Sequence, residues 1–202
     1  MVKLVTLAIL VSLIGCSTRL SLAPMGSNLS ESAMMPTTAT SGRLLLSPQN
    51  TRITFIGSTL LSSHEGTFTQ FTGRLDRPGS DPKDAQFRVE IEMDSVFTKV
   101  PLLTKDLKAS DFFDVAKYPE STFVSTRIQS SVASGSNYII TGNFTIHGIT
   151  RALSFPARFD IDPKSIRLDA TLDIRQSDFS MKSARTTTDD VPVTVSCRIV
   201  RS

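Results

Sequence analysis

Histidine and cysteine are scarce in this 202-residue chain, which has two of each. Its two histidines, His64 and His147, do not stand at metal-ligand spacing with nearby acids. There is no Gly-x-Ser-x-Gly motif, no phosphate-binding glycine loop and no Cys-x-x-Cys pair. These gaps argue against nucleophile-elbow hydrolases, nucleotide-binding enzymes and dithiol redox proteins. The carboxylates alternate along strand-like segments, as on a solvated face, so no acid/base pair stands out. We therefore expect no enzymatic activity and no bound metal.

A strong charge of either sign is also lacking. The formal net charge is +3, and no stretch concentrates the basic residues. Nucleic-acid binding is therefore not supported. Tryptophan is absent and tyrosine occurs twice, whereas phenylalanine occurs 12 times. These counts indicate an apolar interior and no more than that.

The first 16 residues contain an apolar run, Leu4 to Ile14, that is too short to span a bilayer as a helix, since spanning takes about 20 residues. It has the length of a signal-peptide core. The ending Leu-Ile-Gly-Cys16 resembles the lipobox of bacterial lipoproteins, in which the cysteine is lipidated and becomes the first residue of the mature chain. We expect a signal peptide over residues 1–15 and a lipid on Cys16; the alternative is an ordinary secretory signal with an incidental cysteine.

Residues 16–42 form the second expected region, a lipidated cysteine followed by a flexible tether. Ser, Thr, Ala, Pro and Met dominate it, and it has no period of 2 or 3.6. Ser17 is not the acidic residue that often retains lipoproteins at the inner membrane. The expected location is therefore the cell envelope of a bacterium, at the outer membrane and facing the periplasm where the source has two membranes. Residues 43–202 remain for one domain with a substantial core.

The second cysteine, Cys197, is left without a partner if Cys16 carries lipid. It follows Val191, Val193 and Val195 at spacings of two, and Ile199 continues the series. A cysteine on the apolar face of a strand is usually a small buried hydrophobic residue and not a nucleophile. We expect Cys197 to be buried and unreactive.

Apolar and polar residues alternate with a period of two through most of the domain, which predicts strands with one buried face. The clearest segments are residues 84–96, 151–162 and 165–176, and residues 51–60, 64–76, 121–129, 138–148 and 193–200 complete roughly eight strands. Turn residues separate many of them. Charged outer faces and the lack of long helices favour antiparallel pairing. Long strands favour closure into an eight-stranded barrel over a sandwich, and such a barrel either fills with side chains or holds one slender ligand.

The alternation also predicts which side chains point inward. Glu90, Asp169 and Arg198 are expected to point outward. In residues 64–75, Phe68 and Phe71 break the parity, so a β-bulge is predicted there. The residues expected to point inward are Phe87, Val89, Ile91, Phe155, Phe159, Leu168, Leu172 and Cys197.

One segment, DLKASDFFDVAKYPESTF at residues 106–123, interrupts the strands. Leu103 and Leu107 are one helical turn apart, and Ser110 suits the N-cap of a short turn that runs to Asp114. A helix this short must be held by packing. We interpret the segment as a lid or plug that closes one end of the barrel through its apolar residues Leu102, Leu103, Leu107, Phe112 and Phe113; the alternative is that it covers a sheet edge.

The phrases SHEGTFTQFTGRL, VEIEMDSVFT, DLKASDFFDVAKYPESTF and GNFTIHGITRALSFPA resemble the YceI-like family in order and approximate spacing, over residues 45–200. The resemblance implies an extended lipocalin-like barrel, exported by bacteria, that binds long isoprenoid chains such as quinone tails. Two features depart from the family pattern. In IRQSDFS, Arg175 stands one place early, Gln176 stands where an arginine is expected and Ser180 replaces a glycine. The usual tryptophan near the start of the domain is also missing.

Two functions are therefore open. The first is non-enzymatic binding, storage or transport of a long-chain isoprenoid or similar lipid, such as a quinone tail, on a membrane-anchored protein; the bound isoprenoid or isoprenoid quinone is then the ligand. The second is a side-chain-filled barrel that acts as a structural or protein-interaction module of the envelope. The oligomeric state stays open, with a dimer among the options. The residues expected to contact the ligand are Ile53, Phe55, Phe87, Val89, Ile91, Met93, Leu103, Leu107, Phe112, Phe113, Phe123, Phe144, Ile146, Phe155, Ala157, Phe159, Leu168 and Leu172.

Overall fold

The computed structural model describes residues 42–59, 61–76, 79–132, 135–181 and 188–200. The predicted signal peptide, Cys16 and all of the predicted tether except Gly42 lie outside these ranges. Within them, no helix has both the length and the apolar character needed to cross a bilayer. The strands are β1 (Arg43–Leu46), β2 (Thr51–Ser58), β3 (Ser63–Phe68), β4 (Phe71–Asp76), β5 (Gln86–Glu92), β6 (Val96–Thr98), β7 (Glu120–Ser130), β8 (Tyr138–Ile146), β9 (Ile149–Ile161), β10 (Ser165–Arg175) and β11 (Asp190–Val200).

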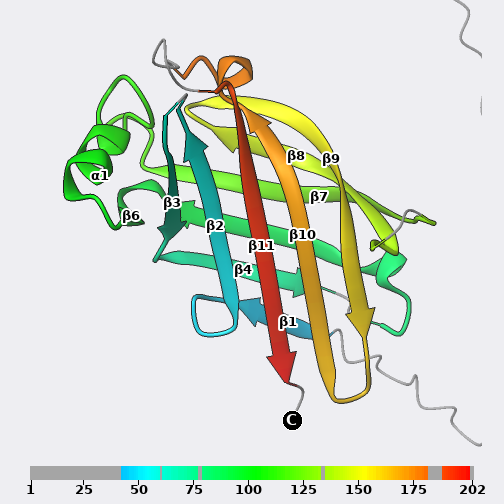
Figure 1. Ribbon diagram of the computed structural model, residues 1–202. Helices are drawn as coiled ribbons and strands as arrows, with labels where there is room; N and C mark the ends of the chain where they lie inside the picture. Colours follow the sequence, from blue (N-terminus) through cyan, green and yellow to red (C-terminus); the bar gives the residue numbers. More distant parts are fainter. Residues whose placement is uncertain (1–41, 60, 77–78, 133–134, 182–187, 201–202) are drawn as a thin grey trace, which may run out of the picture. The chain divides into compact units, whose positions relative to one another are not determined.

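The strands pair into one antiparallel sheet that curls into a closed ring (Figure 1). Its hydrogen-bonded order is β1-β4-β5-β7-β8-β9-β10-β11-β2-β3-β6. Strand β3 continues into β4, and β5 continues into β6, so each of these two pairs acts as one bent strand. Counted in this way, eight long strands follow one another around the ring, and β2 closes it by pairing with both β11 and β3. The predicted all-β antiparallel fold is confirmed; β1 is an addition that pairs with β4.

The bend between β3 and β4 replaces the predicted β-bulge. Phe68 and Phe71 are both buried although they stand three positions apart, and a regular strand would place them on opposite faces. Both rings can face the core because the strand is interrupted at Thr69 and Gln70. The Thr69 N–H donates to the Ser95 carbonyl at 3.2 Å, and the Ser95 hydroxyl donates to the Gln70 carbonyl at 3.1 Å. These bonds join the bend to the matching one in the neighbouring strand, at the 3₁₀ turn η2 (Met93–Ser95).

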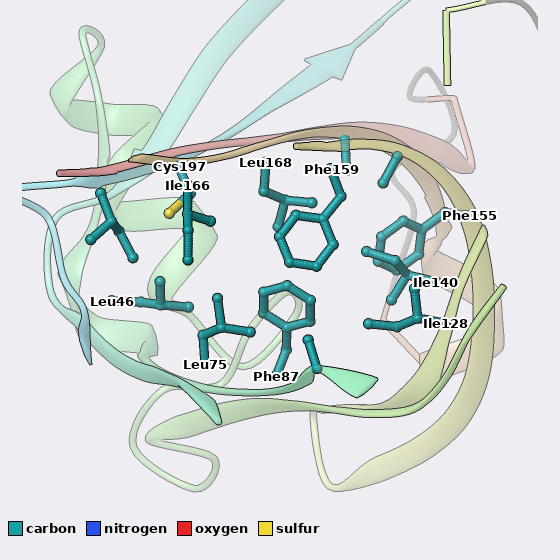
Figure 2. Close-up of a cluster of buried hydrophobic side chains, with 14 residues drawn as sticks. Leu46, Leu75, Phe87, Ile128, Ile140, Phe155, Phe159, Ile166, Leu168 and Cys197 are labelled. Carbon is teal, nitrogen blue, oxygen red and sulfur yellow. The ribbon is translucent and has the colours of Figure 1, made fainter. Parts of the chain in front are cut away.

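The side-chain register agrees with the prediction. Six of the residues expected inside are buried, and Val89 and Leu172 are half-buried against the core. Figure 2 shows Phe87, Phe155, Phe159 and Leu168 pointing into the barrel from facing strands. On the outside, Arg198 is exposed, and Asp169 bonds to Arg167 on the outer face of β10, just as Glu90 bonds to Arg88 on β5.

The interrupting segment forms a short helix and a set of turns beside β6 and β3 (Figure 1). The helix, α1 (Pro101–Lys108), begins earlier than predicted because Pro101 supplies the fixed φ of a first helical residue. The hydroxyl of Thr104 accepts the Thr98 N–H at 3.0 Å and ties α1 to β6. The predicted helical turn capped by Ser110 is wrong: residues 110–113 are non-helical turns, in which the Phe113 N–H donates to the Leu107 carbonyl at 3.0 Å and folds Phe113 back under α1.

Two further 3₁₀ turns complete the fold. The first, η1 (Pro82–Asp84), lies in the connection from β4 to β5, and the side chain of Asp81 caps it by accepting the Lys83 N–H at 2.9 Å. The second, η3 (Gln176–Phe179), follows β10 and ends at Ser180, which has a positive φ of 54°. These two turns lie at opposite ends of the barrel, because β10 leads away from the end that holds the β4–β5 connection.

Candidate ligand-binding cavity

A cavity of about 250 Å³ lies inside the barrel. Every long strand of the ring contributes to its wall, and α1 and the turn after it close one side. No Asp, Glu, Lys or Arg of the described ranges borders it. The apolar residues of the wall are Leu46, Ile53, Phe55, Phe68, Phe71, Phe87, Val89, Ile91, Met93, Leu103, Leu107, Phe112, Phe113, Phe123, Ile140, Phe144, Ile146, Leu153, Phe155, Leu168, Ala170, Leu172, Ile174, Met181, Val191, Val193 and Val195.

All the residues predicted to contact a ligand border this cavity except Ala157 and Phe159. Those two are each only 1% exposed, and they belong to a packed cluster beyond the cavity. The Phe159 ring lies 5.2 Å from the Phe87 ring, centroid to centroid, so Phe87, which borders the cavity, separates Phe159 from it. Alternation places a side chain inside the barrel but does not show whether the space around it is filled, so it did not separate these two residues from those that border the cavity.

Three phenylalanine rings form the wall beneath the helical segment. Phe113 contacts Phe55 edge-on at 6.4 Å and Phe68 at 6.0 Å, and the rings of Phe55 and Phe68 are 5.5 Å apart. Edge-to-face and tilted contacts of this kind add to the stabilisation from burial. The turn after α1 is therefore bound to the barrel wall by aromatic packing, as a closing element requires.

Glycine in β3 makes room for one of these rings. The Phe55 ring lies directly over Gly66, and a Cβ atom there would be 2.2 Å from the ring carbon Cζ. A similar arrangement holds Phe123 over Gly142 in β8, where a Cβ atom would be 2.5 Å from the ring. Glycine inside a strand often marks such a close approach. A side chain at either glycine would therefore displace a ring of the cavity wall.

Polar wall residues gather at the end of the cavity where β2 ends and β11 begins. Ser58, Thr59, His64 and Gln176 border the cavity there. We call this end the mouth and define it by these four residues. The prediction did not include any of them, although the alternation contained the signal for Gln176: it follows Leu172 and Ile174 at spacings of two on the inner face of β10.

The structure also shows how Arg175 and Gln176 are arranged. Arg175 is exposed, and its Nε atom lies 3.3 Å from Asp190. Gln176 is buried and borders the cavity. The guanidinium group is therefore outside the barrel, and an uncharged amide occupies the inward position.

The few polar groups deeper in the wall are paired. Ser121 donates from its hydroxyl to the Thr145 carbonyl at 2.8 Å. Burial raises the pKa of the Cys197 thiol, and a hydrogen bond with Thr51 offsets only part of that rise. In the described ranges, no side-chain nitrogen or oxygen atom that is itself fully buried lacks a partner. The depth of the cavity therefore suits a hydrocarbon chain, which needs no polar contact.

The two histidines lie in different parts of the barrel, and each contacts its own neighbouring groups. His64 borders the mouth, with its Nε2 atom 3.4 Å from the Ser62 hydroxyl. His147 occupies the β8–β9 turn with a positive φ of 53°; its ring lies 4.5 Å from that of Tyr118, and its Nδ1 atom is 3.1 Å from the Phe179 carbonyl. Across the described ranges, no group of three or more His, Cys, Asp or Glu side chains is placed to hold a metal ion.

The YceI-like domain model matches residues 45–199 of this chain. The chain belongs to the YceI-like family. The match spans the whole barrel, from within β1 to within β11, and so includes every strand that borders the cavity.

Curated proteins that are similar to this chain are named UPF0312 proteins. A UPF0312 protein of Pseudomonas putida (strain W619) is 28% identical over 142 residues, which cover 67% of this chain and 73% of the relative. A UPF0312 protein of Pseudomonas syringae pv. tomato is 34% identical over a shorter stretch of 99 residues, covering 49% of this chain and 50% of the relative.

Solved structures share the fold. Burkholderia cenocepacia BcnA matches with a TM-score of 0.66 and 22% identity, over 74% of this chain and 96% of its own. A polyisoprenoid binding domain from Saccharophagus degradans, implicated in plant cell wall breakdown, matches with a TM-score of 0.63 and 14% identity, over 80% of this chain and 99% of its own. At these identities the matches establish a common fold.

Proposed function

We propose that this protein binds, stores or transports one long isoprenoid chain or a similar lipid, such as the tail of a quinone, and catalyses no reaction. The observation that carries the proposal is the uncharged, almost wholly apolar wall of the cavity. Membership of the YceI-like family supports lipid binding at the level of the family. The description of the Saccharophagus degradans relative as a polyisoprenoid binding domain supports the choice of ligand class.

The energetics of burial are sufficient for such a ligand. Each buried CH₂ group contributes about 0.8 kcal/mol, so a five-carbon isoprene unit contributes roughly 4 kcal/mol before the cost of association. Three or four buried units then support micromolar binding, which corresponds to about −8 kcal/mol. No specific polar contact is needed to reach this affinity.

The test is mass spectrometry of an organic extract of the purified protein, followed by binding of a radiolabelled long-chain polyprenol to the emptied protein. We expect a co-purified apolar chain and saturable binding of one polyprenol per barrel. A folded protein that extracts empty and binds prenyl chains of no length would support the alternative, a barrel that serves as a structural or interaction module.

The turn that contains Phe112 and Phe113 is proposed as the lid of this cavity. The double variant Phe112→Ala with Phe113→Ala should speed ligand exchange more than it weakens equilibrium binding, because a lid slows passage in both directions. Stopped-flow displacement of a fluorescent prenyl probe measures the exchange rate. Reduced affinity with an unchanged exchange rate would show that the two rings line the cavity and do not gate it.

We also propose that the barrel is held at a membrane through a lipid on Cys16, on the periplasmic side of an outer membrane. The support is the Leu-Ile-Gly-Cys sequence that ends the apolar run of residues 4–14. The Cys16→Ser variant should leave the membrane fraction, and the wild-type protein should yield a lipidated N-terminal peptide. A variant that still sediments with membranes, beside a wild type without that peptide, would contradict the anchor.

A further inference from the structure

Gln176 is held in one orientation at the mouth. Its Nε2 atom donates to the Thr188 carbonyl at 2.9 Å, and the Thr188 N–H donates to the Ser58 carbonyl at 3.0 Å. The backbone N–H of Gln176 donates to the Asp189 carbonyl at 2.9 Å. The amide nitrogen is therefore engaged, and among the described residues no hydrogen bond uses the Oε1 atom.

This arrangement gives the mouth a hydrogen-bond acceptor. An amide oxygen accepts up to two hydrogen bonds and donates none. Gln176 is buried, and its side chain borders the cavity, so a ligand group that reaches Oε1 is partly removed from water. A headgroup that donates a hydrogen bond satisfies this oxygen, whereas a headgroup without a donor leaves it unpaired, and an unpaired buried polar group is costly.

The charges beside Gln176 disfavour an anionic headgroup. Hydrogen bonds from the Ser177 side chain and backbone, at 2.6 and 2.9 Å, lower the pKa of Asp189 and keep it ionised. Asp178 and Asp190 are exposed nearby. Arg175 lies 3.3 Å from Asp190 and 3.9 Å from Asp189, so its charge is already shared between two carboxylates.

We propose that the mouth selects an uncharged headgroup that carries a hydroxyl, as in a prenol, a prenylated phenol or a quinol, and rejects a chain that ends in a phosphate. This inference rests on the proposed function and specifies the ligand class of the same cavity. A hydroxyl donates to Gln176 Oε1 and costs little to desolvate. A phosphate at the same point meets like charges and loses its hydration without gaining a cation from the described wall.

The experiment compares three ligands of equal chain length: a polyprenol, its methyl ether and its monophosphate. Each competes with a fluorescent prenyl probe for the same cavity. The wild-type protein should bind the polyprenol about three- to tenfold more tightly than the methyl ether, the range that one hydrogen bond supplies. It should bind the monophosphate most weakly of the three.

Two variants assign the effect to Gln176. Gln176→Leu should remove the preference for polyprenol over methyl ether, because the polyprenol loses its hydrogen bond and the ether no longer leaves an amide oxygen unpaired. Gln176→Arg should reverse the order and favour the monophosphate. Thr171→Arg adds the same charge on the exposed outer face of β10 and should leave the wild-type order intact. Thermal unfolding of each variant checks that it is folded, and the leucine variant carries the test if the arginine variant is not.

The outcomes separate this inference from the proposed function. If all three chains bind with equal affinity, the proposed function stands and headgroup selection is overturned. A monophosphate that binds the wild type as tightly as the polyprenol, or more tightly, also overturns it, because the mouth would then supply a cation. If none of the chains binds the folded wild type, the proposed function itself fails and this inference fails with it.

Discussion

The two ends of the barrel both contain inward-facing apolar side chains, but they differ in packing. At the end near the β4–β5 and β9–β10 connections, Leu75, Phe159 and Ile166 are each 1% exposed and fill the interior (Figure 2). We call this the filled end. At the opposite end, beneath α1, the side chains of Phe55 and Phe113 stand around a cavity; this is the hollow end. Both ends are built from the same alternation of apolar and polar residues.

Backbone strain follows the same division. The described residues other than glycine with a positive φ are Asp114, His147 and Ser180, and all three lie near the hollow end. Asp114 ends the turn that carries Phe113, and His147 contacts the turn that Ser180 ends. Such conformations persist only where the surroundings hold them, and they are common at functional sites. The filled end stabilises the fold, and the hollow end depends on that stability to keep its space open.

The largest expected effect is at the filled end. Phe159→Ala removes a ring that is 1% exposed and should lower the free energy of unfolding by about 3–5 kcal/mol. Prenyl binding should not weaken, because Phe159 does not border the cavity. Urea unfolding and probe binding measure the two quantities. Phe97→Ala, at a half-exposed site on β6, is the control and should change neither the free energy of unfolding nor the affinity for the probe. If Phe159→Ala weakened probe binding as well as lowering stability, the distinction between the two ends would be lost.

The reverse effect is expected at the wall of the cavity. Ala170 is buried and borders the cavity, so Ala170→Phe places a ring in the space of the ligand. Affinity for a polyprenol should fall about tenfold or more, equivalent to at least roughly 1.4 kcal/mol. Stability should change less than the 1–3 kcal/mol typical of overpacking a filled core. Ala152→Phe adds the same ring on the exposed face of β9 and should leave binding intact; unchanged binding in Ala170→Phe would mean that the chain lies elsewhere.

A smaller, pH-dependent effect is expected on the outer surface. Burial acts to raise the pKa of Asp169, but hydrogen bonds from Ser196 and Arg167, both at 2.6 Å, together with the positive charges of Arg167 and Arg198, lower the pKa overall. The stabilisation is therefore present above the ordinary aspartate pKa of about 3.9 and is lost as the pH falls through the lowered value of the folded state. A partly exposed pair of this kind contributes about 1 kcal/mol or less.

The variant Asp169→Asn isolates this contribution. Urea unfolding should show the variant less stable than the wild type at about pH 6, and the difference should shrink on acidification to about pH 3. Asp173→Asn changes an exposed carboxylate on the same strand and corrects for the change in net charge. If the stability difference between the variant and the wild type grew on acidification, the pKa of Asp169 would be raised on folding and not lowered.

The smallest effect concerns strain at the hollow end. Ser180 has a φ of 54° and a ψ of 23°, a left-handed conformation that costs a residue with a Cβ atom roughly 1–2 kcal/mol. Glycine avoids this cost but loses about 0.5–1 kcal/mol through the entropy of the unfolded chain. Ser180→Gly should therefore raise the midpoint of thermal unfolding slightly, by the equivalent of less than about 1 kcal/mol. Ser180→Ala keeps the Cβ atom and should give no gain; an equal gain in both variants would assign the effect to the lost hydroxyl.

The alternation in the sequence predicted the antiparallel barrel and the inward register of residues such as Phe87 and Leu168. It did so because a buried strand face demands a period of two, which can be read locally. The corner at Thr69 and Gln70 was missed because it depends on a matching bend in β5–β6, which lies elsewhere in the sequence. The start of α1 at Pro101 was not predicted, although proline is common at the first position of a helix.

The cavity itself was harder to predict than the barrel. Ala157 and Phe159 face either a cavity or other core side chains, depending on the width of the barrel at their level. That width is set by all the strands together. The mouth shows the same limit. Gln176 continues an inward series, but its role depends on Thr188 and Ser58, which are brought to it by β11 and β2.

Cys197 gives the cavity wall a chemical property that the other wall residues lack. In the described ranges it is the one free cysteine; it borders the cavity, and its raised pKa keeps the thiol protonated and slow to react at neutral pH. A slim apolar thiol reagent can therefore reach it only by occupying the space of the ligand. The rate of alkylation at this sulfur would report, in living cells as well as in solution, what fraction of the barrels is empty.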